Sequence, residues 1–142
     1  MPVISQVADA VRDELAAGTF SIPFKAVRAF RYDQTLPEGK ELRVSVVPNA
    51  VKATHAARAV CHYDMEIYVT VSRKIDRAAP ETIDPLLGLV EEIIDFFRLR
   101  RLAKCPGAMW LSTENKPMVS SEHLESLKQF TSLVSLHYRH AR

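Results

Sequence analysis

The stretch that decides the fold is Ala59-Val-Cys-His-Tyr-Asp-Met-Glu-Ile-Tyr-Val-Thr-Val-Ser-Arg-Lys74. Apolar and polar residues alternate along it almost without a break, which is the period of two expected of a half-buried β-strand. The apolar set is Cys61, Tyr63, Met65, Ile67, Val69 and Val71, and the polar set is His62, Asp64, Glu66, Thr70 and Ser72. The usual strand has about five or six residues, so this one must bend, twist strongly or project beyond its core. Projection would offer it to a neighbouring subunit.

The composition predicts one globular domain over residues 1–142, since 47% of the residues are hydrophobic and 25% are charged. The net charge of +2 is small and the basic residues are spread along the chain, so we expect no specific nucleic-acid partner. No stretch approaches the roughly 20 apolar residues that span a membrane, so no membrane partner is expected. The opening Met-Pro-Val-Ile-Ser-Gln lacks the basic and apolar regions of a signal peptide.

The two cysteines, Cys61 and Cys105, form neither a disulfide framework nor a zinc spacing. Cys61 belongs to the apolar set of the long strand, which predicts a small buried thiol. Synthesis in a reducing, intracellular compartment is therefore expected.

Two amphipathic helices are predicted from apolar residues that recur at steps of three and four. The apolar residues of the first helix run from Val3 to Leu15, and Gly18 is the expected stop signal after it. The second runs from Glu81 to Leu102, and Leu89, Phe96 and Leu99 widen its apolar face. Basic residues near its end would complement the helix dipole, although they could also bind phosphate or DNA; they are Arg98, Arg100, Arg101 and Lys104.

Four further strands are predicted, at Phe24–Tyr32, Glu41–Val47, Ala108–Thr113 and Gln129–Tyr138. Asp33–Gly39 reads as a turn, Pro48 ends the second strand, and residues 49–58 read as a mobile loop. Residues 114–125 read as a loop in which Ser121 caps a short helical turn. Short connections between the first three strands favour antiparallel hairpins. The expected fold is therefore α+β, with the order α-β-β-β-α-β-β and a mixed, largely antiparallel sheet of about five strands carrying two helices on one face.

His62, Asp64 and Glu66 share one face of the long strand and in principle could form a metal or acid–base cluster. Successive residues on one face of a strand are about 7 Å apart, however, and their side chains stand parallel instead of converging. A solvated or subunit-facing polar strip is the favoured interpretation. A metal site would require His137 or His55 to fold over the strip.

Other candidate chemistry is weak. A Cys105–His123 nucleophile is disfavoured, because a helix C-terminus raises a thiol pKa. Ser120, Ser121 and His123 lack the glycines of a nucleophile elbow, and the chain has no P-loop, dinucleotide fingerprint, zinc-finger spacing or calcium loop. We therefore predict no enzyme activity, no catalytic residue, no metal and no cofactor.

The outer face of the predicted sheet is the more informative surface. Val47, Val60, Tyr68 and Leu133 add apolar area among its polar residues, and such a mixture is typical of interfaces. The expected subunit interface comprises His62, Asp64, Glu66, Tyr68, Val47 and Arg58.

The chain as a whole resembles the small tail-completion proteins of tailed bacteriophages and prophages, and is similar to the tail terminators of long-tailed phages. The resemblance lies in the order and texture of five stretches: Ile4-Ser-Gln-Val-Ala-Asp-Ala-Val, Leu42-Arg-Val-Ser-Val-Val-Pro48, Ile67-Tyr-Val-Thr-Val71, Ile83-Asp-Pro-Leu-Leu-Gly-Leu-Val-Glu-Glu-Ile93, and Phe130-Thr-Ser with Tyr138. No short motif among them is diagnostic.

The resemblance implies a non-enzymatic structural protein of the virion tail, assembled in the cytoplasm of the bacterial host. Such proteins form a hexameric ring that caps the tail tube and faces the head–tail connector. The implied partners are thus the chain itself, the tail tube protein and connector proteins. A ring needs two different surfaces on each subunit. The long strand with its hairpin partner would form one, and residues 49–58 or 114–125 the other. The alternatives are another phage neck, head–tail joining or minor tail protein, or a small metal- or ligand-binding enzyme module.

Overall fold

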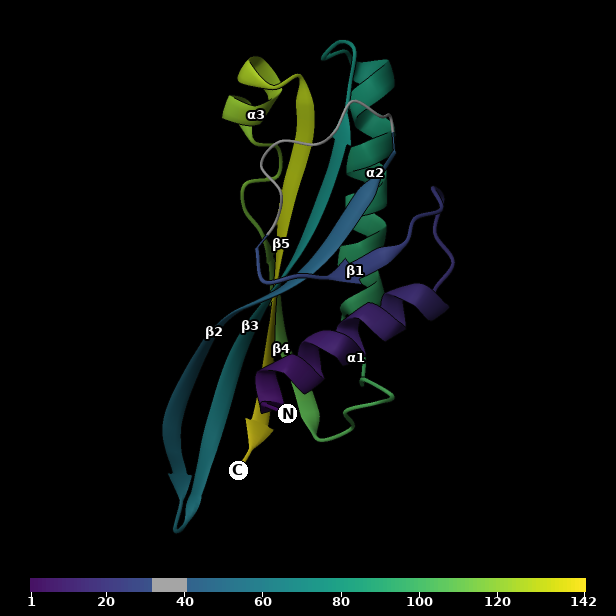
Figure 1. Ribbon diagram of the computed structural model, residues 1–142. Coiled ribbons are helices and arrows are strands. Elements are labelled where there is room, and N and C mark those ends of the chain that lie inside the picture. Colours follow the sequence, from purple (N-terminus) through teal and green to yellow (C-terminus); the bar gives the residue numbers. More distant parts are fainter. Residues whose placement is uncertain (32–40) are drawn as a thin grey trace.

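The structure is a computed structural model that describes residues 1–31 and 41–142. Its helices and strands follow in the order α1 (Val3–Ala17), β1 (Ala26–Arg28), β2 (Arg43–Ala57), β3 (Val60–Lys74), α2 (Pro80–Phe97), β4 (Ala108–Asn115), α3 (Ser121–Ser126) and β5 (Gln129–Ala141) (Figure 1). The turn predicted at Asp33–Gly39, and Tyr32 at the end of the first predicted strand, lie outside the described residues. No helix in the described part of the chain is long and apolar enough to span a bilayer.

The long alternating stretch forms a strand, as predicted, and this strand is at the centre of the sheet. β3 pairs antiparallel with β2 from Arg43↔Ser72 to Ala57↔Val60, and with β5 from His62↔Ala141 to Lys74↔Gln129. β4 lies antiparallel to β5, and the described strands make a five-stranded sheet in the order β1-β2-β3-β5-β4. The α+β class with a mixed, largely antiparallel sheet is confirmed.

One face of this sheet carries the hydrophobic core. The apolar side chains align across the strands, as in the row Val46, Val69 and Val134. α1 buries Val7, Val11 and Leu15, and α2 buries Leu86, Leu89, Val90, Ile93 and Phe97. These residues belong to a single core cluster with the strand side chains, so both predicted helices pack on the same face. Each fully buried side chain of this kind contributes about 1.5–3 kcal/mol to folding.

α2 ends five residues before its predicted end, because a buried carboxylate accepts hydrogen bonds from the segment that follows the helix. Glu14 of α1 accepts hydrogen bonds from the Ala103 amide at 2.7 Å and from Arg100 Nη1 at 3.0 Å. Arg100 also donates to the Phe96 carbonyl oxygen at 2.9 Å and covers the Phe96 ring at 3.7 Å. The basic residues predicted to end the helix therefore follow it. Leu99, predicted to widen the apolar face, has φ 57° and is 80% exposed, so that prediction was wrong.

The first strand is shorter than predicted, and it runs parallel to β2 instead of antiparallel. β1 covers only residues 26–28 and pairs parallel with Val44–Val46 of β2. Parallel neighbours need a connection of about a dozen residues or more, and residues 29–42 supply that length. The predicted antiparallel hairpin between the first two strands was therefore wrong.

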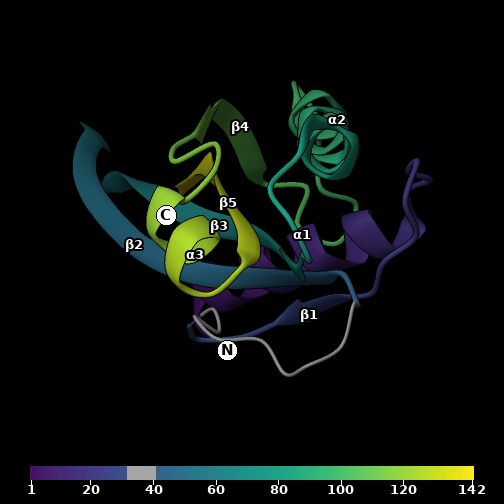
Figure 2. The same ribbon diagram turned by 90° about the horizontal axis from the view of Figure 1, so that it is seen from above.

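The predicted loop at residues 49–58 is the outer half of β2 and its turn. β2 continues through Pro48 and follows a long arc when seen from above (Figure 2). β1 pairs with β2 only as far as Val46, so no described strand lies beside Pro48 on the outer edge of β2. The N–H that proline lacks would point to this edge, and its absence therefore removes no hydrogen bond between strands. A register shift at Pro48/Ala50 absorbs the extra residue.

Four smaller predictions differ from the structure. β4 and β5 extend two and three residues beyond their predicted ends, to Asn115 and Ala141. Ser120, not Ser121, caps the short helix α3 by accepting a hydrogen bond from the His123 amide at 3.3 Å. Cys61 is exposed, because the core does not reach the outer end of β3.

Replacing Glu14 by Gln is expected to lower the free energy of unfolding by about 1–3 kcal/mol, because a buried charged acceptor that serves two donors is lost. Urea denaturation would measure the change. Glu125→Gln on exposed α3 is the matched control and should change stability by less than about 0.5 kcal/mol. Equal effects of the two substitutions would contradict the structural role given to Glu14.

Candidate assembly surface on the projecting hairpin

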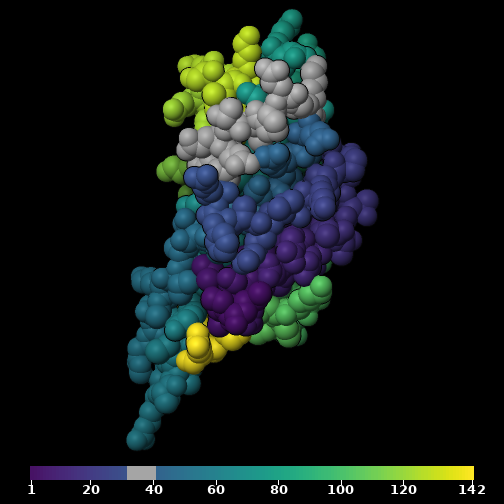
Figure 3. All heavy atoms as spheres, viewed as in Figure 1, coloured from purple at the N-terminus to yellow at the C-terminus, as the bar shows by residue number. Residues whose placement is uncertain are grey.

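The outer halves of β2 and β3 form a hairpin that projects beyond the body of the molecule (Figures 1 and 3). Its turn consists of Arg58 and Ala59, and Ala59 has a left-handed φ of 63°. Two-residue hairpin turns favour such left-handed residues, because their twist matches that of the strands. The backbones of Cys61 and Arg142 exchange two hydrogen bonds of 2.8 Å each, so β5 supports β3 almost to the turn.

The polar face of the hairpin holds its charges in cross-strand pairs. Asp64 lies opposite Arg139, whose Nε and Nη2 donate to its two carboxylate oxygens at 2.7 and 3.0 Å. Glu66 lies opposite His137, with Nε2 at 3.5 Å from a carboxylate oxygen, and it accepts a hydrogen bond from Asn49. Both carboxylates are therefore engaged within the chain.

These contacts change the acidity of Asp64. The hydrogen bonds from Arg139 hold the pKa of Asp64 below its ordinary value of 3.8, against a smaller opposing effect of burial. The same pair raises the pKa of Arg139. The ion pair thus persists throughout the physiological pH range.

The structure brings most of the predicted interface residues onto one side of the hairpin. His62, Asp64, Glu66 and Tyr68 are half-buried on the polar face of β3, and Arg58 is exposed in the turn. Val47 lies opposite Tyr68 but is only 4% exposed, so the expectation that it adds exposed apolar area was wrong.

The sequence analysis named His137 as a residue that could fold over the strip, and it missed the partners Arg139 and Asn49. Arg139 is 75 positions away from Asp64, and only the register of β3 against β5 identifies that pair. The alternation of residues 129–138 was the available signal, but it does not fix a register.

The opposite face of the hairpin leaves the core and becomes solvent-exposed. Met65 is buried, whereas Cys61 is exposed. Val51, which lies opposite Met65 on this face, is 46% exposed. Val60 beside the turn is 36% exposed and lies on the polar face with His62. Arg142 covers the Tyr63 ring at 5.4 Å. The outer hairpin therefore presents a small apolar surface that no helix of the described chain covers.

The outer edge of the hairpin is also unpaired. β1 meets β2 only at Val44–Val46, with one further hydrogen bond from the Ala29 amide to the Val46 carbonyl oxygen. No described strand lies beside residues 49–57. Exposed strand edges of this kind are templates for contact with another chain.

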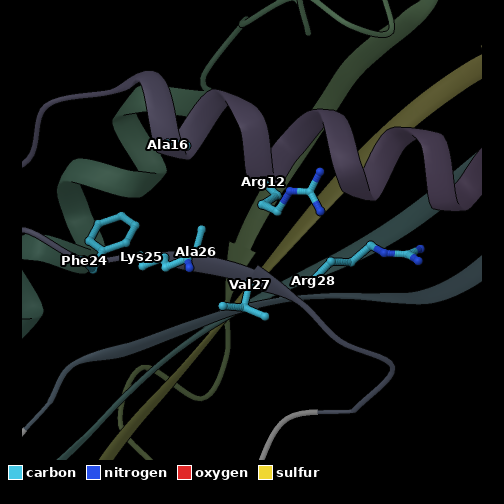
Figure 4. A pocket seen from close by; sticks show the side chains of 7 residues that line it. All are labelled: Arg12, Ala16, Phe24, Lys25, Ala26, Val27 and Arg28. Carbon is cyan, nitrogen blue, oxygen red and sulfur yellow. The ribbon is translucent and has the colours of Figure 1, made fainter.

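A hollow of about 510 Å³ lies between α1 and β1 and is lined by Arg12, Ala16, Phe24, Lys25, Ala26, Val27 and Arg28 (Figure 4). Its arginines already have carboxylate partners. Arg28 Nε lies 3.0 Å from Asp9, and Arg12 lies 3.4 Å from Asp9 and 3.2 Å from Asp13. These pairs neutralise most of the positive charge of the hollow, so we assign no ligand to it.

The remaining candidate residues have structural contacts. Cys105 is buried, and burial raises the pKa of its thiol, which disfavours the reactive thiolate. His123 Nδ1 lies 2.8 Å from the Thr131 hydroxyl on β5. Lys104, from the basic group after α2, pairs with Asp13 at 3.0 Å. In the part of the chain that the structure describes, no group of His, Cys, Asp and Glu is arranged to hold a metal ion.

Comparison with known proteins extends the description of the fold. No protein-family model matches the sequence, and no curated protein matches it. A solved structure without a functional name is similar over 97% of this chain and 92% of that one, with a TM-score of 0.50 and 18% identity. At this identity the likeness concerns the fold alone.

A second similar structure is described as the sheath/tube terminator, in the extended state, of an extracellular contractile injection system, PVC. The TM-score is 0.47 and the identity 15%, over 94% of this chain and 55% of that one. This chain therefore spans about half the length of that protein. The match is looser than the first, and no functional argument is based on it.

Replacing Asp64 by Asn is expected to lower stability by about 1 kcal/mol at pH 7, the upper end for partly exposed ion pairs. The pKa of Asp64 is depressed by folding, so its contribution is present above the unfolded pKa of about 4 and is lost as the pH falls below it. The difference between Asp64→Asn and wild type in thermal melts should therefore shrink between about pH 5 and pH 2. Glu125→Gln on α3, whose exposed carboxylate has no ion pair among the described residues, is the control. A difference that stays constant with pH would contradict the Asp64–Arg139 assignment.

Proposed function

We propose that the chain is a non-enzymatic structural protein that caps the tail tube of a long-tailed phage or prophage as a ring and helps to join tail to head. The observation that carries the proposal is the projecting hairpin, which has an unpaired edge and exposed Val51 and Val60 beyond the core. The projection is three-stranded over most of its length, since β5 pairs with β3 as far as Cys61, but no described strand lies along its outer β2 edge. An unpaired strand edge beside exposed apolar side chains is typical of a surface that contacts another chain.

The sequence resemblance to tail-completion proteins is the reason for proposing a ring on the tail tube as the assembly. That resemblance implies the chain itself, the tail tube protein and head–tail connector proteins as partners. The hairpin supports a subunit contact, and a closed ring requires a second, different surface on the same subunit. A neck or head–tail joining protein is the alternative, and it differs in binding the head connector instead of the end of the tube.

Within this function, the subunit contact is proposed to include the polar strip of the hairpin. His62, Asp64, Glu66, Tyr68 and Arg58 contribute exposed or half-exposed side chains there. Val47 lies beside Tyr68 on the same face of the sheet and is buried there.

Purified protein is expected to form a closed ring, most plausibly of six subunits, as its concentration rises. Native mass over a concentration series, followed by negative-stain imaging, would reveal the ring. Addition to growing tail tubes should stop their elongation and place protein at one end. A compact dimer, or protein that neither assembles nor binds tube ends, would contradict the proposal. Binding to head connectors but not to tubes would favour the alternative.

Reversing the strip charges with Asp64→Lys and Glu66→Lys is expected to impair assembly while the monomer remains folded. The substitutions also place Lys opposite Arg139 and His137, so a stability loss of about 1–2 kcal/mol is expected in thermal melts. Asp64→Asn with Glu66→Gln is the control, since it removes the same ion pairs without adding positive charge. Normal rings from the Lys variant would remove the strip from the interface.

A further inference from the structure

The hairpin tip carries positive charge without any acidic residue. Between Ala50 and Tyr63 the ionisable side chains are Lys52, Arg58, two histidines and Cys61, and no Asp or Glu occurs. Lys52 and Arg58 are exposed, and neither forms an ion pair with a described residue. Lys52 lies opposite Asp64, but the two carboxylate oxygens of Asp64 accept hydrogen bonds from Arg139. The tip is thus a basic surface that also presents the exposed Val51 and Val60.

α2 shows the opposite pattern. Pro80–Phe97 contains no Lys or Arg. Its exposed carboxylates recur at steps of three, seven and four and therefore follow one side of the helix; they are Glu81, Asp84, Glu91 and Asp95. No described residue forms an ion pair with any of them. Leu99, just after the helix, adds an apolar side chain that is 80% exposed.

A second feature of α2 allows close approach. Gly88 lies in the same row, between Asp84 and Glu91, and nothing lies within 4 Å of the position that a Cβ would occupy. A neighbouring backbone or side chain could therefore reach the helix surface between the carboxylates. The row offers negative charge at both ends and space at its centre.

The hairpin tip lies at the bottom of Figure 1, whereas α2 begins at the top and runs down to the middle of the molecule beside α1. The two surfaces are therefore separated within one chain. We infer that the basic hairpin tip of one copy docks on the acidic side of α2 of a second copy. This inference rests on the proposed ring and names the pair of surfaces that would close it.

The physical basis is charge complementarity combined with burial of exposed apolar groups. Opposite charges across an interface steer association and fix orientation, and screening by salt weakens them. Val51, Val60 and Leu99 would leave water in the contact. Because the surfaces differ, each subunit uses one of them toward each neighbour, which is the heterologous arrangement of rings.

The decisive experiment exchanges the charges. Lys52→Glu with Arg58→Glu, and separately Glu91→Lys with Asp95→Lys, should each weaken self-association by at least about 100-fold. An equimolar mixture of the two variants should restore it, because each reversed surface then meets its complement. Glu114→Lys with Glu125→Lys, on exposed parts of β4 and α3, should assemble as wild type. Sedimentation velocity at low and high salt would measure association, and thermal melts would check folding.

The outcomes test the contact between the tip and α2 separately from the proposed tail-capping function. If both charge variants assemble normally, or if their mixture fails to restore assembly, the pairing of tip and α2 is wrong while the ring stands. A wild type that stays monomeric at every concentration and salt also overturns the pairing, and capping of tail tubes then tests the function. Arg58→Glu alone is the second variant should the double substitution in the hairpin fail to fold.

Crosslinking gives an independent readout. Cys61 is exposed beside the hairpin turn and Cys105 is buried, so a Gly88→Cys variant adds one reactive partner on α2. A short bis-maleimide reagent should join Cys61 of one copy to position 88 of another and produce ladders of covalent oligomers. Ser126→Cys on α3 is the matched control and should give few. Equal ladders from both variants would contradict the contact.

Discussion

The fold depends on the hydrogen bonding of β3 to a neighbour on each side along almost its whole length. β2 pairs with it from Ser72 to Val60 and β5 from Lys74 to His62, and the Cys61–Arg142 bonds complete the ladder to β5. In the inner half, buried Val69 and Val71 fix the register, since a shift by one residue would turn them toward the opposite face. The same register then places Asp64 opposite Arg139 in the outer half, where no core selects it. The buried half of the sheet thus sets the geometry of the exposed half.

The packing of β5 and α1 also determines which carboxylates form ion pairs. Asp64 and Glu66 find partners on the neighbouring strand, and Glu14, Asp9 and Asp13 find them around α1. Exposed charges without an ion pair among the described residues remain in several places, including Lys25, Arg98, Arg101 and Glu125. On the hairpin tip and along the exposed side of α2, the charges of each surface share one sign.

The parts of the fold that could be predicted from the sequence are those with strong periodicity. The alternation in residues 60–74 and the helical spacing in α1 and α2 report which side chains are buried, and burial decides these elements. Pro48 and Asn49 are strong local signals for a strand end, but the ladder to β3 overrides them because Pro48 lies on an edge. The end of α2 depends on Glu14, which is 86 residues away from Arg100, and no local pattern reveals that contact. The candidate surface was predictable as a face of a strand, whereas its partners required the register.

The segregation of charge also bears on the symmetry of any assembly. A twofold dimer pairs residue i of one copy with residue j of the other and also j with i, so it can use two different surfaces reciprocally. Two basic hairpin tips would repel each other, and so would two acidic sides of α2, so neither surface is self-complementary. Charge therefore disfavours tip-to-tip and helix-to-helix contacts, and it leaves a reciprocal twofold dimer or a head-to-tail contact. Head-to-tail contacts close into a ring when the rotation between neighbours divides a full turn and otherwise continue as a filament. That rotation depends both on the direction in which the arc of β2 carries the tip away from the body and on the angle at which the tip meets α2.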